Sequence, residues 1–365
     1  MDQGNQTGRP KASGPRLCVS VVMPALNEGR FIAATVQSLQ AQSTPNFDLE
    51  ILVIDGMSED DTRQKVTTLC AKDPRVRLLL NPSRHTPAAL NVGLRAASGD
   101  YVCIMGAHAS YDPDYIAVCL QELLAHDAVG CSGKIATAPA DSSLQARLVA
   151  WAACHPFASS ARSVRTQPEG YADTVPFPVM RKQALLDIGG YNAGLIRNQD
   201  NDMNQRLRAL GLKLYVTAKT RCRYYPRPNV RSFLKHAYTS GLWNALSLRQ
   251  NPESLSLRHF VPLAFVTALL VLAAFASVGG FANTYSRDAA LALGVVLATH
   301  LGVGTFAAVR IGLREKTATT LWLAPVILAF HCAYGLGTLR GLFLPFPGLE
   351  AVPAQGSEKS SKDCA

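Results

Sequence analysis

Two different patterns of hydrophobic and polar positions divide the chain near residue 259. Before it, short apolar runs alternate with stretches that carry charges every few residues. After it come three uncharged runs, at 260–281, 289–309 and 318–339. Each run has about 21 residues, and roughly 20 are needed to cross a hydrocarbon core as a helix. The pattern predicts three membrane-spanning helices over 260–339, followed by a tail over 340–365.

Alternating strands and helices are predicted for residues 17–229. Apolar or β-branched runs typical of buried strands lie at 19–24, 49–55, 76–80 and 101–105. Helices are expected over 31–42, from Ser58 to Cys70, over 87–97 and from Asp112 onward. We expect Ser58 to cap the second helix and Pro113 to take the first position of the fourth. This order predicts an α/β domain with a mostly parallel sheet and helices on both faces.

The segments that flank this domain are polar or basic. Residues 1–16 are rich in Gly, Pro, Gln and Lys and lack a signal-peptide core, so a disordered leader is expected. Residues 230–259 are expected to form an amphipathic helical region at the membrane interface. Basic side chains gather around its start: Lys219, Arg221, Arg223, Arg227, Arg231 and Lys235. The aromatic anchors expected at the headgroup interface are Tyr224, Tyr225, Tyr238 and Trp243.

The charge of the connectors predicts how the chain is oriented in a membrane. The connector after the second apolar run, residues 310–316, is net positive. The charged residues of the connector after the first run are Arg287 and Asp288 alone, whose charges cancel. The positive-inside rule places the second connector in the cytoplasm, together with everything before residue 260. The pattern therefore predicts a multi-pass protein of the inner membrane whose α/β domain faces the cytoplasm.

Two histidines, His300 and His331, fall inside the apolar runs. An ionisable residue within a membrane segment is either a functional group or a neutral side chain bonded to a neighbouring helix. The sequence leaves both interpretations open.

Net charge and cysteine usage narrow the classes of partner. The chain has 36 Lys and Arg against 26 Asp and Glu, a formal charge of +10. This excess suggests nucleic acid, anionic lipid headgroups or a phosphorylated small molecule. Nucleic acid is disfavoured, because the charge gathers beside the apolar runs and no nucleic-acid motif is present. Nine Cys without a C-x-x-C pair favour reduced thiols over a disulfide framework or a structural zinc site.

Polar side chains follow the predicted strands at their carboxyl ends, where ligands of parallel sheets bind. They are Asn27 and Glu28, Asp55, Arg84, and the segment Gly106-Ala107-His108. Each alone could be an ordinary turn residue, but together they predict a nucleotide crevice. Neither a dinucleotide fingerprint nor a P-loop follows the first strand, so a cation or arginine side chains must hold the phosphates.

Six segments carry a family resemblance. VSVVMPALNE at 19–28, DGMSEDDT at 55–62 and ALNVGLRAASGD at 89–100 resemble the amino-terminal half of a family-2, GT-A-fold inverting glycosyltransferase. DTVPF at 173–177, GGY at 189–191 and RNQDNDMNQRLR at 197–208 resemble the ExoA-like branch of succinoglycan biosynthesis. That branch consists of membrane-associated enzymes that extend lipid-linked sugars. The resemblance covers residues 19–241 and implies a Rossmann-like sheet that binds a nucleotide-sugar donor.

The resemblance also implies roles for single residues of the donor site. Pro24, Ala25, Asn27 and Glu28 would line the nucleoside pocket, Asp55 would accept a hydrogen bond from the nucleobase, Arg84 would lie near the pyrophosphate, and Asn91, Ala107 and His108 would lie near the donor.

One segment departs from the family pattern. Where the family has Asp-x-Asp, and the ExoA-like branch Asp-Ala-His, this chain has Gly106-Ala107-His108. His108 is left as the one expected protein ligand of a divalent cation, with Mn²⁺ better suited to imidazole than Mg²⁺. Either the diphosphate and His108 hold the ion, or tight metal binding has been lost.

The catalytic base is expected at Asp200, which matches the Asp of the family's Glu-Asp-x-Glu signature. Gln199 stands where Glu is common, and Asp202 replaces the second acid. Both acids could instead serve only the electrostatics of a helix start. Asp173, Arg223 and Arg227 are assigned with Gln199 and Asp202 to the acceptor side, where the basic cluster would hold a polyprenyl-linked diphosphate or simply attract anionic lipid.

These features predict a membrane-anchored inverting glycosyltransferase. It would transfer a hexose, glucose from UDP-glucose, to a lipid-linked saccharide in exopolysaccharide or cell-surface polysaccharide biosynthesis. A polyprenyl-phosphate monoglycosyl synthase is the alternative within the same class, and a catalytically silent membrane scaffold is the alternative outside it. The Q-x-x-R-W sequence of processive synthases is absent at the junction, which favours a single addition.

Overall fold

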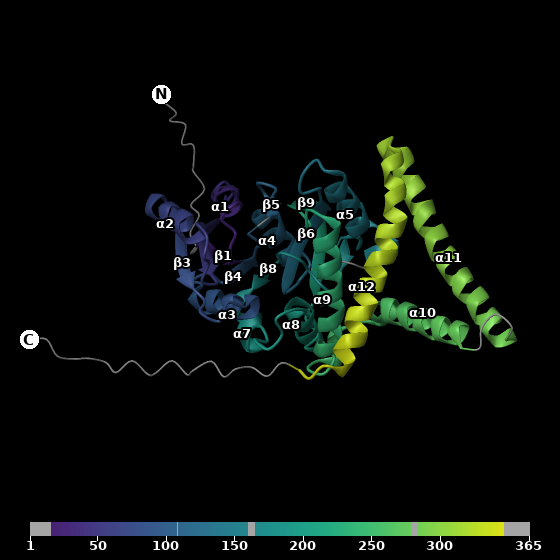
Figure 1. Ribbon diagram of the computed structural model, residues 1–365. Coiled ribbons are helices and arrows are strands. Elements are labelled where there is room, and N and C mark those ends of the chain that lie inside the picture. Colours follow the sequence, from purple (N-terminus) through teal and green to yellow (C-terminus); the bar gives the residue numbers. More distant parts are fainter. Residues whose placement is uncertain (1–15, 108, 160–164, 279–282, 347–365) are drawn as a thin grey trace, which may run out of the picture.

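The computed structural model describes residues 16–107, 109–159, 165–278 and 283–346. Within these ranges an α/β domain is followed by a bundle of long helices (Figure 1). The predicted leader up to residue 15, the tail from residue 347 and His108 lie outside the described residues.

The first half of the domain is a parallel sheet. Its strands are β1 (Leu17–Ala25), β2 (Phe47–Asp55), β3 (Val76–Leu80) and β4 (Tyr101–Ile104), in the order β3-β2-β1-β4. The connecting helices are α1 (Ile32–Gln40), α2 (Thr62–Lys72) and α3 (Thr86–Ala96). Ala25 pairs with Asp55 at the carboxyl ends of β1 and β2, so the loops that follow both strands begin side by side.

The second half of the domain makes the sheet mixed. From β4 the order continues as β8 (Val179–Arg181), β6 (Gly130–Thr137), β9 (Leu214–Tyr224) and β5 (Ala109–Tyr111), and β7 (Gly170–Tyr171) pairs with β9. β8 is antiparallel to both β4 and β6, whereas β6 and β9 are parallel. The helices here are α4 (Tyr115–Ala125), α5 (Leu144–Cys154), α6 (Pro156–Ser159), α7 (Lys182–Asp187) and α8 (Gln199–Ala209).

Helices cover both faces of the sheet, as the alternation of elements predicts. Val19, Val21 and Met23 of β1 face α1, α2 and α4 in one apolar core. Val22, on the opposite face, joins a second core with α3, α7 and α8. The two cores follow from the period of two along a strand, which sends successive side chains to opposite faces. This packing fixes α8 beneath the sheet in the view of Figure 1.

Two helix starts differ from the sequence prediction. α2 begins at Thr62 rather than after Ser58, because the Ser58 hydroxyl accepts a hydrogen bond from the Asn27 amide instead of capping the helix. α4 begins at Tyr115 rather than at Pro113. The carbonyls of Asp112 and Pro113 instead accept hydrogen bonds from Gln42 and Ser43, which hold this segment in a turn.

The helical region begins with α9 (Val230–Ser247) and the short helices η1 (Pro252–Ser254) and η2 (Leu257–Phe260). It continues with α10 (Val261–Ser277), α11 (Thr284–Glu315), η3 (Ala318–Trp322) and α12 (Leu323–Phe343). Three of the described helical segments are long and apolar enough to cross a membrane: Leu257–Ser277, Thr284–Glu315 and Ala318–Phe343. α11 extends past both predicted ends, because helical hydrogen bonding continues through charged residues that the apolar pattern excludes.

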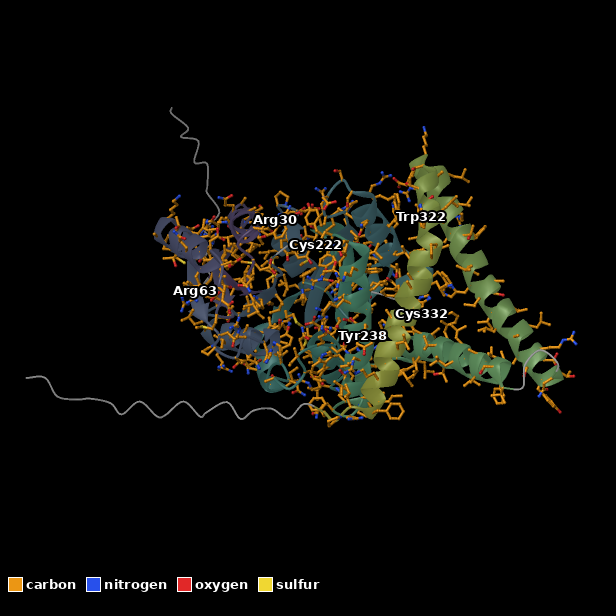
Figure 2. All side chains as sticks on the ribbon, in the orientation of Figure 1. Arg30, Arg63, Cys222, Tyr238, Trp322 and Cys332 are labelled. Carbon is orange, nitrogen blue, oxygen red and sulfur yellow. The ribbon has the colours of Figure 1, made fainter. Side chains whose placement is uncertain are left out.

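α10 and α11 project away from the α/β domain, and most of their apolar side chains reach into open space (Figure 2). α12 differs from them in its burial. In the segment Ala318–Phe343, 44% of the most apolar stretch is buried, compared with 6% in the segment that contains α10. It runs parallel to α9 along the domain (Figure 1), and glycines allow the two helices to approach closely. A Cβ atom on Gly337 would lie 2.0 Å from the Tyr238 carbonyl oxygen.

α12 is attached to the domain at both ends. Leu323, Val326 and Ile327 near its start share an apolar core with Val149 of α5. In its last turn, the Leu342 carbonyl accepts a hydrogen bond at 2.8 Å from the guanidinium of Arg249, which follows α9. Trp243 of α9 is only 8% exposed, so it is a packed side chain and not the exposed membrane anchor that the sequence suggests.

Candidate active site

The loops after β1 and β2 are joined by hydrogen bonds at the edge of the sheet. The Asn27 amide donates to the Ser58 hydroxyl and the Glu28 amide to the Thr62 hydroxyl, both at 2.9 Å. Asn27 has a φ of +56°, a conformation that Asn tolerates better than most residues. Its side chain accepts from the Glu59 amide at 2.9 Å. The predicted nucleoside loops are therefore one connected unit, which Pro24 and Ala25 enter from the end of β1.

Asp55 stabilises these connected loops from a buried position. Its carboxylate is fully buried, accepts from the Ser58 amide at 3.0 Å and forms an ion pair with Arg63 at 3.2 Å. A nucleobase could reach the carboxylate only if Arg63 moved. In the arrangement observed, Asp55 holds the loop that would face the nucleoside.

The remaining donor residues of the described chain lie around the same edge. Arg84 has a φ of +59° and an exposed ion pair with Glu59 at 2.8 Å, which leaves its guanidinium free to exchange partners in solvent. Ala107 is buried, and its carbonyl accepts from the Thr35 hydroxyl at 2.8 Å. The structure thus brings the loops after β1 and β2 together, with Arg84 linked to them through Glu59.

The expected metal site lacks its first carboxylate. The Gly106 amide donates to the Tyr111 hydroxyl at 2.9 Å, and a Cβ atom on Gly106 would lie 3.1 Å from the Phe177 ring. An aspartate side chain here would crowd that ring. In the described part of the chain, which omits His108, no three His, Cys, Asp or Glu side chains lie close enough to hold a metal ion. The described residues therefore do not form a protein-held cation site.

Asp200 lies in the first turn of α8 and its side chain faces open space. The surrounding protein nevertheless removes much of the bulk water, and this desolvation raises the pKa of the Asp200 carboxyl to about 6. The preceding Gln199 has a buried Oε1 atom that accepts no hydrogen bond from any described residue. A carboxylate that titrates near neutral pH and is open to solute can act as a general base.

Tyr191 connects Asp200 to the donor side. It is buried, and desolvation followed by the charge of Asp200 raises the pKa of its hydroxyl. Asn91 of α3 holds the Tyr191 backbone with two hydrogen bonds, donating to its carbonyl at 2.7 Å and accepting from its amide at 2.8 Å. Asn91, expected near the donor, thus positions the loop that packs against the catalytic candidate.

Asp202 has a different environment from Asp200. It is 2% exposed, forms an ion pair with Arg206 at 2.9 Å and accepts from Asn251 at 2.9 Å. Arg206 also donates to the carbonyls of Ile188 and Gly190, both at 2.7 Å. Asp202 is therefore a structural link between α8, the loop that carries Tyr191 and the segment after α9.

The residues assigned to the acceptor side are only partly brought together. Arg227 lines a cavity of about 640 Å³ between α8, α9 and the apolar helices, and Asn198 and Asn201, which flank Asp200 along α8, line it too. Asp173 is exposed and forms an ion pair with Arg208 at 3.6 Å. Arg223 lies exposed on β9, paired with β5, and does not line the cavity.

Several residues that line this cavity are not predicted from the sequence. Arg165, His236 and Arg258 all line the cavity, although they lie in a loop, in α9 and in η2. A local pattern carries no signal for such a cluster, because its members are separated by tens of residues. Of the basic residues that line the cavity, only Arg227 belongs to the basic cluster predicted from the sequence.

His300 and His331 face each other across α11 and α12. The Nε2 atom of His300 and the Nδ1 atom of His331 lie 2.9 Å apart. Of the two interpretations left open by the sequence, the bond to a neighbouring helix is confirmed. Both rings also line the cavity.

Comparison with known proteins agrees with this geometry. Residues 20–188 match the model of the glycosyl transferase family 2. The chain is 29% identical over 325 residues to the succinoglycan biosynthesis protein ExoA of Rhizobium meliloti, a match that covers 88% of this chain and 94% of that protein.

Two further proteins match along most of their length. A dolichyl N-acetyl-α-D-glucosaminyl phosphate 3-β-D-2,3-diacetamido-2,3-dideoxy-β-D-glucuronosyltransferase of Methanococcus voltae is 22% identical over 342 residues, covering 89% of this chain and 97% of that protein. The mannosyltransferase PcManGT of Pyrobaculum calidifontis, solved with GDP-Man and Mn²⁺, shares the fold with a TM-score of 0.56 at 19% identity, covering 92% of this chain and 91% of that one.

Proposed function

We propose that this chain, a membrane-associated glycosyltransferase whose residues 20–188 match the model of glycosyl transferase family 2, transfers a hexose from a nucleotide sugar to a lipid-linked saccharide. The single observation that carries the proposal is the position of Asp200. This solvent-open carboxylate lies in the first turn of α8, with neighbours that line the cavity toward the apolar helices.

We propose an inverting displacement at the anomeric carbon. The acceptor hydroxyl oxygen forms the new bond to the sugar, the bond to the diphosphate oxygen breaks, and the nucleoside diphosphate leaves. Asp200 takes the proton of the attacking hydroxyl. The connected loops after β1 and β2 hold the nucleoside, so donor and base act from opposite sides of the reacting carbon.

The similarity of this chain to its relatives supports the class of substrate more than it supports any particular sugar. The name of the Rhizobium relative refers to succinoglycan, and that of the Methanococcus relative to a dolichyl phosphate-linked saccharide acceptor. UDP-glucose is the donor we would test first, on the strength of the ExoA-like motifs. We further propose the inner membrane as the location, with the α/β domain in the cytoplasm, from the charge of the connectors.

A divalent cation remains a prediction from the sequence. PcManGT was solved with Mn²⁺, whereas the described residues of this chain contain no group of three His, Cys, Asp or Glu side chains that could hold a metal ion. No step above depends on the ion, and assays with Mn²⁺, Mg²⁺ or a chelator would establish whether turnover requires one.

The proposal is tested with membranes that contain the chain, a panel of radiolabelled nucleotide sugars and extraction of the lipid products. We expect label in a lipid-linked saccharide with the wild type. Asp200→Asn should lower transfer by about 10²- to 10⁴-fold, the usual contribution of a general base, while donor binding persists. Asp187→Asn is the matched control, since Asp187 is an exposed carboxylate on the neighbouring α7.

Two outcomes would contradict the proposal. Unchanged transfer by Asp200→Asn onto a polyprenyl phosphate would favour the monoglycosyl synthase, because a phosphate acceptor has no hydroxyl proton to lose. If neither transfer nor donor hydrolysis is found with any nucleotide sugar, the result would favour the silent scaffold. The match of residues 20–188 to the glycosyl transferase family 2 model argues against that alternative.

A further inference from the structure

The cavity beside α8 joins the reaction centre to the apolar helices. Its volume of about 640 Å³ lies within the range of roughly 300–1,000 Å³ that is common for ligand pockets. Asn198, Asn201 and Thr174 line it on the side of α8, and Phe265 of α10 and Phe330 of α12 line it on the side of the apolar helices. One continuous space therefore runs from the neighbours of Asp200 to segments apolar enough to enter a membrane.

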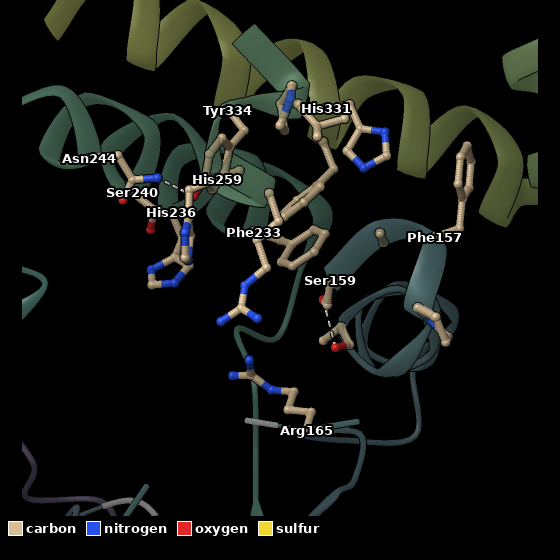
Figure 3. A pocket seen from close by; sticks show the side chains of 18 of the residues that line it. Phe157, Ser159, Arg165, Phe233, His236, Ser240, Asn244, His259, His331 and Tyr334 are labelled. Atoms are coloured by element: carbon tan, nitrogen blue, oxygen red, sulfur yellow. Dashed lines mark hydrogen bonds between the residues drawn. The ribbon is translucent and has the colours of Figure 1, made fainter. Parts of the chain in front are cut away.

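The end nearest the α/β domain is cationic. Arg165 and Arg227 line this end, Arg258 of η2 lines the cavity from the helical region, and none of the described lining residues is Asp or Glu. Figure 3 shows the Arg165 guanidinium pointing into the space below His236 and Phe233. Arg165 lies over the Tyr224 ring, with its Cζ atom 5.1 Å from the ring centroid.

The electrostatic effect of this cluster is visible on its neighbours. Burial, followed by the charges of Arg197 and Arg227, lowers the pKa of His236 to about 4. Burial and the charge of Arg227 also lower the pKa of Arg197. Positive charge is thus concentrated here without a lining carboxylate to balance it, an environment that favours a phosphoryl group.

The opposite end is aromatic and apolar. Phe157, Phe233, Phe265, Phe330, Val261 and Pro262 line it, and Figure 3 shows Phe157 and His331 on this wall. His300 is only 8% exposed, and its Nδ1 atom has no hydrogen-bond partner among the described residues. Next to this histidine pair the wall is formed by aromatic and apolar side chains, which suit a hydrocarbon chain.

We propose that this cavity binds the acceptor lipid, with its phosphate or diphosphate among Arg165, Arg227 and Arg258 and the first units of its hydrocarbon chain between Phe265 and Phe330. The assignment rests on the proposed function for the identity of the lipid as a polyprenyl carrier. A lipid seated in this way would present its saccharide toward Asn198 and Asn201, next to Asp200. Long acceptor chains continue along the apolar helices, because the cavity is too small to hold them whole.

The test measures binding and does not depend on turnover. The full chain is placed in phosphatidylcholine nanodiscs and titrated with decaprenyl diphosphate, with inorganic diphosphate and phosphatidic acid as competitors. Arg227→Gln and Arg258→Gln should each weaken binding of the lipid diphosphate by about tenfold, as expected for loss of a charge-assisted hydrogen bond. Arg314→Gln, a matched loss of charge on the exposed last turn of α11 outside the cavity, should bind like the wild type.

A chain variant separates the two ends of the site. Phe265→Ala should weaken binding of decaprenyl diphosphate while leaving competition by inorganic diphosphate unchanged. Thermal unfolding of each variant is compared with that of Arg314→Gln, so that a folding defect is not read as lost binding.

Three results would overturn the assignment. Equal affinity of the Arg227, Arg258 and Arg314 variants would exclude the arginine cluster. Competition by inorganic diphosphate as strong as that by the lipid, with no effect of Phe265→Ala, would indicate a free-anion site. Equal competition by phosphatidic acid would indicate general attraction to anionic headgroups.

The outcome for the site is separate from the outcome for the function. If wild-type membranes transfer sugar and Arg227→Gln transfers equally well at all acceptor concentrations, the cavity assignment fails while the proposed function stands. If the lipid binds with the expected pattern but no sugar is transferred, the proposed function fails while the cavity assignment stands.

Discussion

Asp200 and Asp202 show how much the surroundings decide the role of a carboxylate. They lie two residues apart on α8, which separates their directions by about 200° on a helix of 3.6 residues per turn. Asp202 points inward to Arg206 and Asn251, whereas Asp200 faces open space. The motif alone left both open to a purely electrostatic role at the helix start, and burial now separates them.

The raised pKa of Asp200 predicts a pH dependence of transfer. A general base acts in its ionised form, and desolvation raises the pKa of Asp200 to about 6. We therefore expect the turnover number to fall about tenfold for each pH unit below about 6 and to level off above it. The measurement is transfer at saturating donor and acceptor between pH 5 and 8.

The residual activity of Asp200→Asn provides the control for this profile. Its pH dependence should be flat over the same range, because the amide does not titrate. If the turnover number of Asp200→Asn falls below pH 6 in the same way as that of the wild type, the titrating group is not Asp200.

At the scale of elements, the pairing of α9 with α12 depends on missing side chains. Gly241 faces the Tyr334 carbonyl, and Gly337 and Gly341 face the carbonyls of Tyr238 and Leu242. Close approach through small residues at spacings of four is a known way for apolar helices to associate. It also explains why α9, which carries Arg231 and Lys235, can lie along an apolar helix: the shared surface is formed mostly by small and apolar groups.

Substitution of these glycines should destabilise the helix pair. A Cβ atom on Gly337 would lie 2.0 Å from a backbone oxygen, so Gly337→Ala forces α9 and α12 apart. We expect a loss of about 1–3 kcal/mol in unfolding free energy, the usual range for overpacking. Thermal unfolding of the detergent-solubilised chain measures the effect.

Gly294→Ala on α11 is the matched control. A Cβ atom there has nothing within 4 Å, so the variant should be neutral or slightly stabilised by the higher helix propensity of Ala. Equal stability of the two variants would contradict the glycine-mediated contact between α9 and α12.

For the whole molecule, the position of α12 bears on how the protein meets the membrane. Three spans in series would place the end of α12 on the side opposite the α/β domain. In the structure, however, the start of α12 packs on α5 and its end is bound by Arg249 after α9, so α5 and α9 together flank it along its length. This packing favours membrane insertion of α10 and α11, with α12 lying along the domain.

The two arrangements make opposite predictions for the end of α12. We expect a cysteine introduced at Phe343 to be labelled from the same side as one introduced at exposed Arg223, in a background without native cysteines. A membrane-impermeant thiol reagent applied to sealed inverted vesicles makes the measurement. Labelling from opposite sides would establish three spans.

The elements of the α/β domain could be predicted because their signals are local. Continuous apolar or β-branched runs mark β1 to β4, because β1, β2 and β4 are buried on both faces, and helical spacing marks α1 and α3. The two helix starts predicted incorrectly depend on partners elsewhere in the chain. Ser58 is bonded to Asn27, and Pro113 to Ser43, and no local pattern reveals such a bond.

The sequence by itself determined the class of protein, the order of β1 to β4 with the helices between them, and Asp200 as the candidate base. These rest on periodicity and on motifs that keep their spacing along the chain. Only the tertiary structure decided that Phe177 stands beside Gly106, that Asp202 is a structural link, and that Arg165, Arg227 and Arg258 share one cavity. The physical reason is that contacts between distant segments depend on how the sheet and helices pack, which no local pattern records.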